Sequence, residues 1–136
     1  MMMARMSENT FTMRSWQEDV VSGAEDSPRY AHVHATFAYS GIIEGTSDCD
    51  YLLFYPGADA DSAGTTSPGL ERIEGSVDGR SGSFVIKHDV GFDERGVTGT
   101  WRVLPGSGTG ELAGLSGAGT ISGASETMGY TFDFEV

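Results

Sequence analysis

A glutamate and a histidine in two neighbouring predicted strands are the side chains of this sequence best suited to acid–base chemistry. Glu71 lies in the stretch 69–78 and His88 in the stretch 82–92, and each shares a strand face with apolar residues. A carboxylate beside an imidazole in apolar surroundings can serve as general base and acid, because desolvation and the neighbouring charge both shift protonation. One alternative is a buried pair whose hydrogen bonds to each other have a purely structural role. The other is a strand register that keeps the two side chains apart.

Two predicted turns set the register of these strands. If residues 79–80 are the central residues of the first turn, Glu71 lies directly across from His88. If residues 94–95 centre the next turn, His88 lies across from Trp101. Directly opposed side chains have Cβ atoms about 4.5–5.5 Å apart. We therefore expect these three side chains in one row on an inner wall, with Glu71 as base and His88 as its partner.

Aromatic residues on the predicted inner faces are candidates for a substrate-binding wall. Small-molecule sites are mostly apolar and aromatic, with few polar groups. We expect Tyr39, Tyr51, Phe84 and Trp101 in this role. Ordinary core packing is the alternative for all four, and it is favoured for Phe84.

Glu44 is a further binding candidate whose placement depends on a single turn. A two-residue hairpin at 40–41 puts it across from Phe37 and inside, whereas a three-residue loop puts it outside with Asp48 and Asp50. The outside placement is slightly favoured. One residue of loop length decides, because a slip of one residue turns every side chain of a strand to the other face.

His32, His34 and Cys49 are the remaining residues of ligand type. The H-x-H spacing can chelate a metal, as in cupins, but the glutamate and further histidine of that pattern do not follow at the right distance. Alternation places both histidines on the polar side, so we expect solvated histidines and no metal site. Cys49 stands between two aspartates with no basic neighbour, which favours an inert thiol. No cofactor is expected.

The elements that must position these residues are short strands. No stretch sustains a helical period over three turns, and short alternating runs are separated by Gly, Asp, Ser and Pro, which indicates an all-β domain. A small, polar loop is expected at 56–68 and one helical turn at 111–115. The eight expected strands are at 9–18, 29–39, 41–55, 69–78, 82–92, 96–104, 117–122 and 127–135.

Size and charge limit the classes of partner. A chain of 136 residues is expected to form one domain at 9–136, after a loose N-terminal segment at 1–8. A net charge of −12 disfavours nucleic acid and anionic membranes. With one cysteine and no apolar run of signal-peptide or membrane-spanning length, a cytoplasmic protein is expected.

Several sequence blocks, taken in order, are similar to the bacterial domain of unknown function 3224. They are Thr10–Trp16, Tyr39–Gly45, Gly69–Arg72, Gly79–Phe84, Gly99–Trp101 and Pro105–Leu115. That family resembles the allene oxide cyclase and dirigent barrels, which share a glycine ladder like the one at 108–114. The resemblance implies an eight-stranded antiparallel barrel with a central cavity, and self-association into a homo-oligomer.

Three functions are compatible with such a barrel. The first is a small-molecule-binding cyclase or isomerase, which steers a reactive apolar intermediate by cavity shape with acid–base assistance and without a cofactor. The second is a non-catalytic carrier or sensor of an apolar metabolite. The third is a scaffold with a solid interior, which a cavity of less than roughly 300 Å³ would favour. Fold alone does not transfer a reaction.

Overall fold

A computed structural model describes residues 9–25, 27–56, 65–93 and 96–136. The segment 1–8 that we expect to be loose, residues 57–64 of the expected loop and the turn residues 94–95 lie outside these ranges. The described chain is all-β, and its helical content is the 3₁₀ turn η2 (Gly110–Leu112), within the helical turn predicted at 111–115 apart from its first residue. Among the described residues, no helix is long and apolar enough to cross a membrane.

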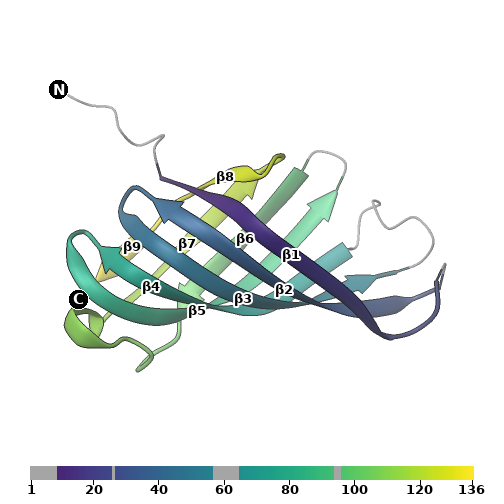
Figure 1. The fold of residues 1–136 in the computed structure, drawn as a ribbon, viewed down its shortest axis with the longest axis horizontal. Helices are drawn as coiled ribbons and strands as arrows, with labels where there is room; N and C mark the ends of the chain where they lie inside the picture. The colour runs from purple at the N-terminus through teal and green to yellow at the C-terminus, as the bar shows by residue number, and fades with distance from the viewer. Residues whose placement is uncertain (1–8, 26, 57–64, 94–95) are drawn as a thin grey trace.

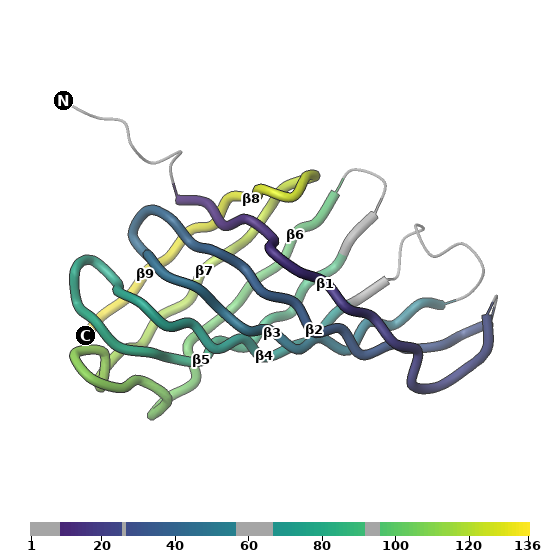
Figure 2. The backbone as a smooth tube through the Cα atoms, viewed as in Figure 1, coloured from purple at the N-terminus to yellow at the C-terminus, as the bar shows by residue number. Residues whose placement is uncertain are grey.

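In the described part of the chain, nine antiparallel strands make up one sheet, and eight of them form a ring (Figure 1). Strands β1 to β6 pair in chain order, β6 pairs with β7, β7 with β8, and β8 with β1. Figure 2 follows this path along the chain. The strands are β1 (Thr10–Ser22), β2 (Arg29–Ser40), β3 (Ile43–Tyr55), β4 (Thr65–Val77), β5 (Arg80–Asp93), β6 (Gly96–Val103), β7 (Ser116–Gly123), β8 (Thr127–Tyr130) and β9 (Asp133–Glu135).

Several predicted strand boundaries differ from the structure, and β1 runs to Ser22, beyond its predicted end at 18. The strand predicted at 127–135 is two strands, β8 and β9, which pair with successive parts of β7. The strand predicted at 69–78 begins earlier, at Thr65, because the residues assigned to the end of the loop pair with β5 up to Phe92. Pro68 is tolerated there because the pairing of β4 with β3 is interrupted between Gly69 and Thr66.

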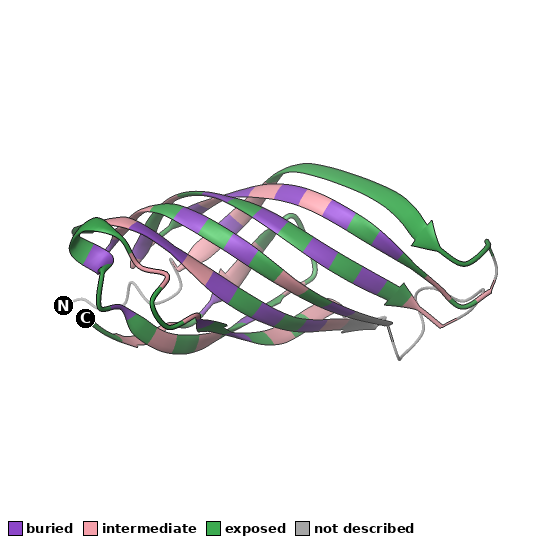
Figure 3. Ribbon diagram, turned by 90° about the horizontal axis from the view of Figure 1, so that it is seen from below, coloured by how far each residue is buried: buried purple, intermediate pink, exposed green. Residues whose placement is uncertain are grey.

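The alternation of side chains along each strand separates an inside from an outside. In β2, Ala31, Val33, Ala35, Phe37 and Tyr39 are buried, and the residues between them are more exposed (Figure 3). The inner faces of the ring gather into one apolar core. Burial of apolar area is the main favourable contribution to folding, so it fixes which face of each strand points inward.

The turn between β4 and β5 differs from the prediction by one residue at its centre. Its two central residues are Asp78 and Gly79, with φ of 50° and 85°, and Val77 pairs with Arg80. Positive φ at both positions is typical of the type I′ turn, which fits the twist of a hairpin. Glu71 therefore pairs with Ile86 rather than with His88.

This shift changes the residue that Glu71 pairs with, but not the face of the sheet to which its side chain points. Moving the turn centre by one residue moves the pairing by two, and side chains alternate with a period of two. Glu71 therefore keeps its inward direction and lies diagonal to His88, which pairs with Gly69. The second predicted register is confirmed, because His88 pairs with Trp101.

Candidate functional site

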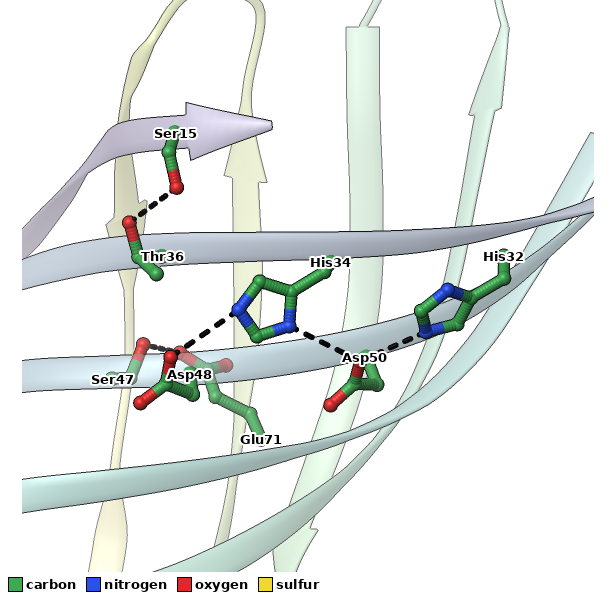
Figure 4. Close-up of polar contacts among 8 residues, drawn as sticks. All are labelled: Ser15, His32, His34, Thr36, Ser47, Asp48, Asp50 and Glu71. Carbon is green, nitrogen blue, oxygen red and sulfur yellow. Dashed lines mark hydrogen bonds and ion pairs between the residues drawn. The ribbon is translucent and has the colours of Figure 1, made fainter. Parts of the chain in front are cut away.

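Glu71 is the centre of a buried polar network inside the ring. Its Oε2 accepts a hydrogen bond from Tyr39 Oη at 2.8 Å. It accepts a second from Ser47 Oγ at 2.5 Å, which is drawn in Figure 4. Its Oε1 lies 2.5 Å from Nε2 of His88. The side chains of Glu71 and His88 are each 1% exposed. The carboxylate is thus fully withdrawn from water and has a polar partner on three strands, β2, β3 and β5.

The strand geometry explains why these side chains meet. Diagonal neighbours on one face of a sheet are about 7–8 Å apart at their Cα atoms, within reach of long side chains. Glutamate and histidine are both long enough to close the diagonal between β4 and β5. Ser47 pairs with Ile73, two residues along β4 from Glu71, so it too approaches from a diagonal position.

Two members of this cluster are not among the predicted site residues. Ser47 and Cys49 are buried on the inner face of β3, where they alternate with the exposed Asp48 and Asp50. The signal that would have found them is the same parity that puts the two aspartates outside. Serine and cysteine are not typical core residues, and neither was expected to be catalytic here. Only the alternation along β3 could have indicated that their side chains point inward.

Burial holds the hydroxyl and thiol groups around Glu71 in their protonated forms. The pKa of Tyr39 is raised well above its usual value by burial, by the charge of Glu71 and by the hydrogen bond to it. The pKa of Tyr51 is raised by burial, Cys49 and Glu71, and burial also raises the pKa of the Cys49 thiol. The network therefore consists of fixed proton donors around one acceptor.

Cys49, Glu71 and His88 also form a possible metal-binding group. One ligand atom from each lies within 4.8 Å of the others, and thiolate, carboxylate and imidazole are all zinc ligands. The raised pKa of Cys49 opposes the thiolate form that a metal requires. Glu71 is already occupied by three hydrogen-bond partners. The arrangement is better suited to holding a carboxylate than to holding a cation.

The tyrosine pKa values predict how stability responds to alkali. A phenol with a folded-state pKa above its unfolded value of about 10 contributes stability that is complete below that pH and is lost as the pH rises through the folded pKa. Unfolding should therefore become easier above about pH 10. Tyr39 and Tyr51 should ionise only as the chain unfolds, and Tyr130, with its pKa raised to about 12 by burial, should ionise late.

Ultraviolet absorbance of the phenolate, recorded with circular dichroism over the same pH range, checks this prediction. The chain has five tyrosines. Tyr39→Phe should remove one late-titrating group and leave the others unchanged. If all the tyrosines ionised near pH 10 while the β-sheet signal persisted, the buried network would not be protected in the way described.

A cavity of about 280 Å³ lies at one end of the ring interior. Its wall is almost entirely apolar and aromatic, and the residues with polar groups in it are two serines, two tyrosines and Glu126. The ring closes through two short pairings, of β1 with β8 over Thr10–Thr12 and of β8 with β7 over Gly129 and Tyr130, and the rest of β1 pairs with β2 alone. The lining residues are Phe11, Met13, Trp16, Phe37, Tyr51, Leu53, Tyr55, Ser67, Val90, Val97, Ile121, Ser125, Glu126 and Met128.

Tyr51 connects this cavity with the polar network. It lines the cavity, and its ring centre lies 5.6 Å from that of His88. Within the described part of the chain, the cavity wall includes neither Glu71 nor His88. His88 Nδ1 is buried and has no hydrogen-bond partner among the described residues, so one polar atom of the imidazole is unused. The predicted acid–base pair thus lies behind the cavity wall rather than in it.

The other predicted binding residues have different surroundings. Tyr39 is engaged with Glu71. Trp101 and Phe84 contact the ring of Phe132, with ring centres 4.7 Å and 6.3 Å apart. These aromatic contacts fill the opposite end of the interior with side chains. Of the four aromatic candidates, Tyr51 is the one that lines the cavity.

Glu44 is exposed on the outer face and therefore does not belong to an interior binding wall. Tyr39 pairs with Gly45, so Ser40 faces Glu44 across a three-residue loop. This is the outside placement that the sequence slightly favoured. The side chain shares its face with Asp48 and Asp50. The prediction that Glu44 contributes to the binding wall is therefore wrong.

Trp16 shows why much of the cavity wall escaped prediction. A bulge between Met13 and Ser15 shifts the register of β1 by one residue, so that Trp16 pairs with the buried Ala35 and faces inward. Simple alternation from Phe11 would put Trp16 outside, because a bulge reverses the parity of every later residue. At the rim, Glu18 accepts hydrogen bonds from Trp16 Nε1 at 3.2 Å and Tyr55 Oη at 2.7 Å.

Comparisons with known proteins agree with this fold and leave the function open. A family model described as a protein of unknown function (DUF3224) matches residues 7–134. A crystal structure of a protein with unknown function from the DUF3224 family, from Shewanella oneidensis MR-1, is similar with a TM-score of 0.70 and 24% identity. The similarity covers 96% of this chain and 97% of that one. No protein with a curated description matches.

Proposed function

Because the chain belongs to the DUF3224 family of proteins of unknown function, we propose a function from its interior: it binds a small apolar molecule inside the ring of strands. The observation that carries the proposal is the apolar cavity of about 280 Å³ at one end of the ring interior. A packed core normally leaves few voids larger than a water molecule. A hollow of this size is therefore better suited to holding a ligand than to stability.

The volume sets the size of the ligand. Ligand pockets are usually about 300–1,000 Å³, so this cavity of about 280 Å³ lies just below that range. It falls on the side of the limit of roughly 300 Å³ that favours a scaffold, so it has no room for a drug-sized ligand and admits only a smaller one. An apolar cavity of about 150 Å³ in an engineered protein accepts benzene. We infer a ligand of one or two small rings, or a short branched chain, with a single polar end directed toward Glu126, Ser125 or the hydroxyl of Tyr55.

The resemblance to the allene oxide cyclase and dirigent barrels supports the same proposal. On this interpretation the ring is an eight-stranded barrel of that type, and its interior holds an apolar metabolite or intermediate. The carrier or sensor function needs only the cavity and is the simpler form of the proposal. A homo-oligomer, as in those barrels, is part of the expectation and is independent of the ligand.

A cavity-filling substitution tests the proposal. Val90 is buried and lines the cavity, so Val90→Phe should occupy ligand space and weaken binding of naphthalene at least about tenfold, since each 1.4 kcal/mol is a factor of ten. Leu70→Phe is the matched control, because Leu70 is 49% exposed. Isothermal titration calorimetry with naphthalene and benzene gives both affinities, and quenching of Trp16 fluorescence provides an independent signal.

The proposal fails if the unmodified protein binds neither compound, or if Val90→Phe binds them as well as the unmodified chain does. Circular dichroism and thermal unfolding of both variants separate a filled cavity from a disrupted fold. Thermal unfolding is needed because overpacking by Val90→Phe typically costs about 1–3 kcal/mol of stability even where the fold is kept.

A second candidate function is a cofactor-independent cyclase or isomerase. It is favoured by the position of Tyr51, which contacts both the cavity and His88, and by the unused Nδ1 of that histidine. In this proposal Glu71 is the base and His88 its partner, and a small rotation of the Tyr51 ring admits the ligand to the pair. The raised pKa of Tyr51 keeps its hydroxyl protonated, so that it can donate a hydrogen bond to the ligand.

A further inference from the structure

A carboxylate joins two aromatic side chains of the cavity wall at its rim. Glu18 of β1 accepts a hydrogen bond at Oε1 from Trp16 Nε1, at 3.2 Å, and another at Oε2 from Tyr55 Oη, at 2.7 Å. Both donors line the cavity, and the side chain of Glu18 is exposed. The carboxylate is therefore held against the cavity wall and remains accessible to a molecule that enters from solvent.

The strand register explains how Glu18 comes to lie at the cavity. After the bulge in β1, Trp16 pairs with Ala35 and Glu18 with Val33, and both partners are buried on the inner face of β2. Residues two apart on a strand point to the same face, so Glu18 follows Trp16 to the inner side. Tyr55 is the last residue of β3, so the hydrogen bond from its hydroxyl to Glu18 passes over β2.

The charges at this rim are mainly negative. Within the described part of the chain, the cavity wall has one charged residue, Glu126, and no lysine or arginine. Glu126 is exposed, and Glu18 adds a second carboxylate. Arg29 supplies one positive charge beside Tyr55 but is not part of the wall. With a net charge of −12 for the whole chain, the potential at the rim attracts cations and repels anions.

The aromatic residues of the wall favour the same sign of charge. A cation within about 6 Å of the centre of an aromatic ring is attracted to the face of that ring, and ammonium ligands are recognised in this way. The guanidinium of Arg29 already lies 4.6 Å from the ring centre of Tyr55. The aromatic wall residues are Phe11, Trp16, Phe37, Tyr51 and Tyr55.

Resting on the ligand-binding function proposed above, we propose that the ligand is an apolar amine that binds as its ammonium ion. Its hydrocarbon part occupies the cavity, and its ammonium group lies at the rim, beside Glu18 and the rings of Trp16 and Tyr55. An ammonium group has N–H donors for the carboxylate oxygens of Glu18, which still have lone pairs to accept them. An anionic ligand would instead bring a like charge to Glu18 and Glu126.

Calorimetric titration with naphthalene and three derivatives tests this inference. Naphthylmethylamine, naphthalenemethanol and naphthoate carry a positive, a neutral and a negative group on the same ring system at neutral pH. The amine should bind at least about tenfold more tightly than naphthoate, because it gains a charged hydrogen bond where the anion meets repulsion. The alcohol should lie between the two, since it can donate a hydrogen bond without a charge.

Glu18→Gln should remove most of this preference, because it keeps the shape and an amide oxygen but not the charge. The quantity compared is the ratio of the amine and naphthoate affinities, with the affinity for naphthalene as the reference in each variant. Glu135→Gln is the matched control. It removes the same charge from an exposed residue of β9 that is not part of the cavity wall, so the ratio should stay as in the unmodified chain.

Nuclear magnetic resonance of the two tryptophan indole N–H groups locates the ammonium group. The amine should shift the signal of Trp16, which donates to Glu18, and leave that of the buried Trp101 unchanged.

The outcomes separate this inference from the proposed function. If naphthalene does not bind, the proposed function is wrong and the inference falls with it. If naphthalene binds but the amine binds no more tightly than naphthoate, only the inference is overturned. The same holds if Glu18→Gln keeps the preference, or if Glu135→Gln loses as much of it, because the preference would then come from the net charge of the chain.

Discussion

Replacing Glu71 with alanine should lower the free energy of unfolding by about 3 kcal/mol or more, because each buried polar partner left without its acceptor costs about 1–3 kcal/mol. The substitution leaves Tyr39 Oη, Ser47 Oγ and His88 Nε2 without their acceptor in a site closed to water. A buried polar group without a partner is costly because it has lost its hydrogen bonds to water as well. Denaturant unfolding followed by circular dichroism measures the loss.

Glu71→Gln is the matched control, because it keeps the shape and an amide oxygen that Tyr39 and Ser47 can bind. It should cost much less than Glu71→Ala, and ligand binding in the cavity should survive, since Glu71 is not part of the wall. If Glu71→Gln folds and binds but loses turnover of a ligand, the cyclase or isomerase candidate gains support. If Glu71→Ala proves as stable as the unmodified chain, the network is not what holds this part of the interior.

Replacing Gly75 with alanine should have an effect of similar size, about 2–4 kcal/mol, from overpacking together with backbone strain. Gly75 of β4 pairs with Gly45 of β3 and with Gly82 of β5, which forms a glycine row across three strands. A Cβ at Gly75 would collide with the backbone carbonyl oxygen of Glu44, and its φ of 155° disfavours a side chain. Glycines at such positions let strands approach closely and bend.

Gly114→Ala is the control for this prediction. A Cβ at Gly114 would meet only a backbone carbon of Val136, at an ordinary distance of 3.9 Å. Its free energy of unfolding should change little, and thermal unfolding of the two variants gives the comparison. Equal stabilities would show that the glycine row reflects composition rather than a close approach of the strands.

Local patterns in the sequence were sufficient for much of the fold. The alternation from Phe84 to Val90 predicts an inward face, and the structure buries the residues concerned. The pairing of His88 with Trp101 also follows from a turn position that the sequence suggests. Both succeed because a strand alternates with a period of two, and burial of apolar area leaves only one face that can point inward.

The prediction that Glu71 meets His88 succeeded despite a wrong register. The turn is centred on Asp78 and Gly79, one residue earlier than expected, so the direct pairing became a diagonal one. An error of two residues in pairing preserves the face, and long side chains close the remaining distance. A one-residue error of pairing would have separated Glu71 from His88.

Tertiary structure alone decided where the apolar cavity lies. The bulge in β1 turns Trp16 inward, and β1 pairs with β8 only over Thr10–Thr12. The outside placement of Glu44 depends on the three-residue loop between β2 and β3. Bulges, loop lengths and ring closure depend on contacts between strands distant in sequence, whereas alternation is a property of each strand by itself. Alternation therefore determined most inward faces, such as that from Phe84 to Val90, whereas only the folded ring turned Trp16 inward and decided which residues surround a cavity.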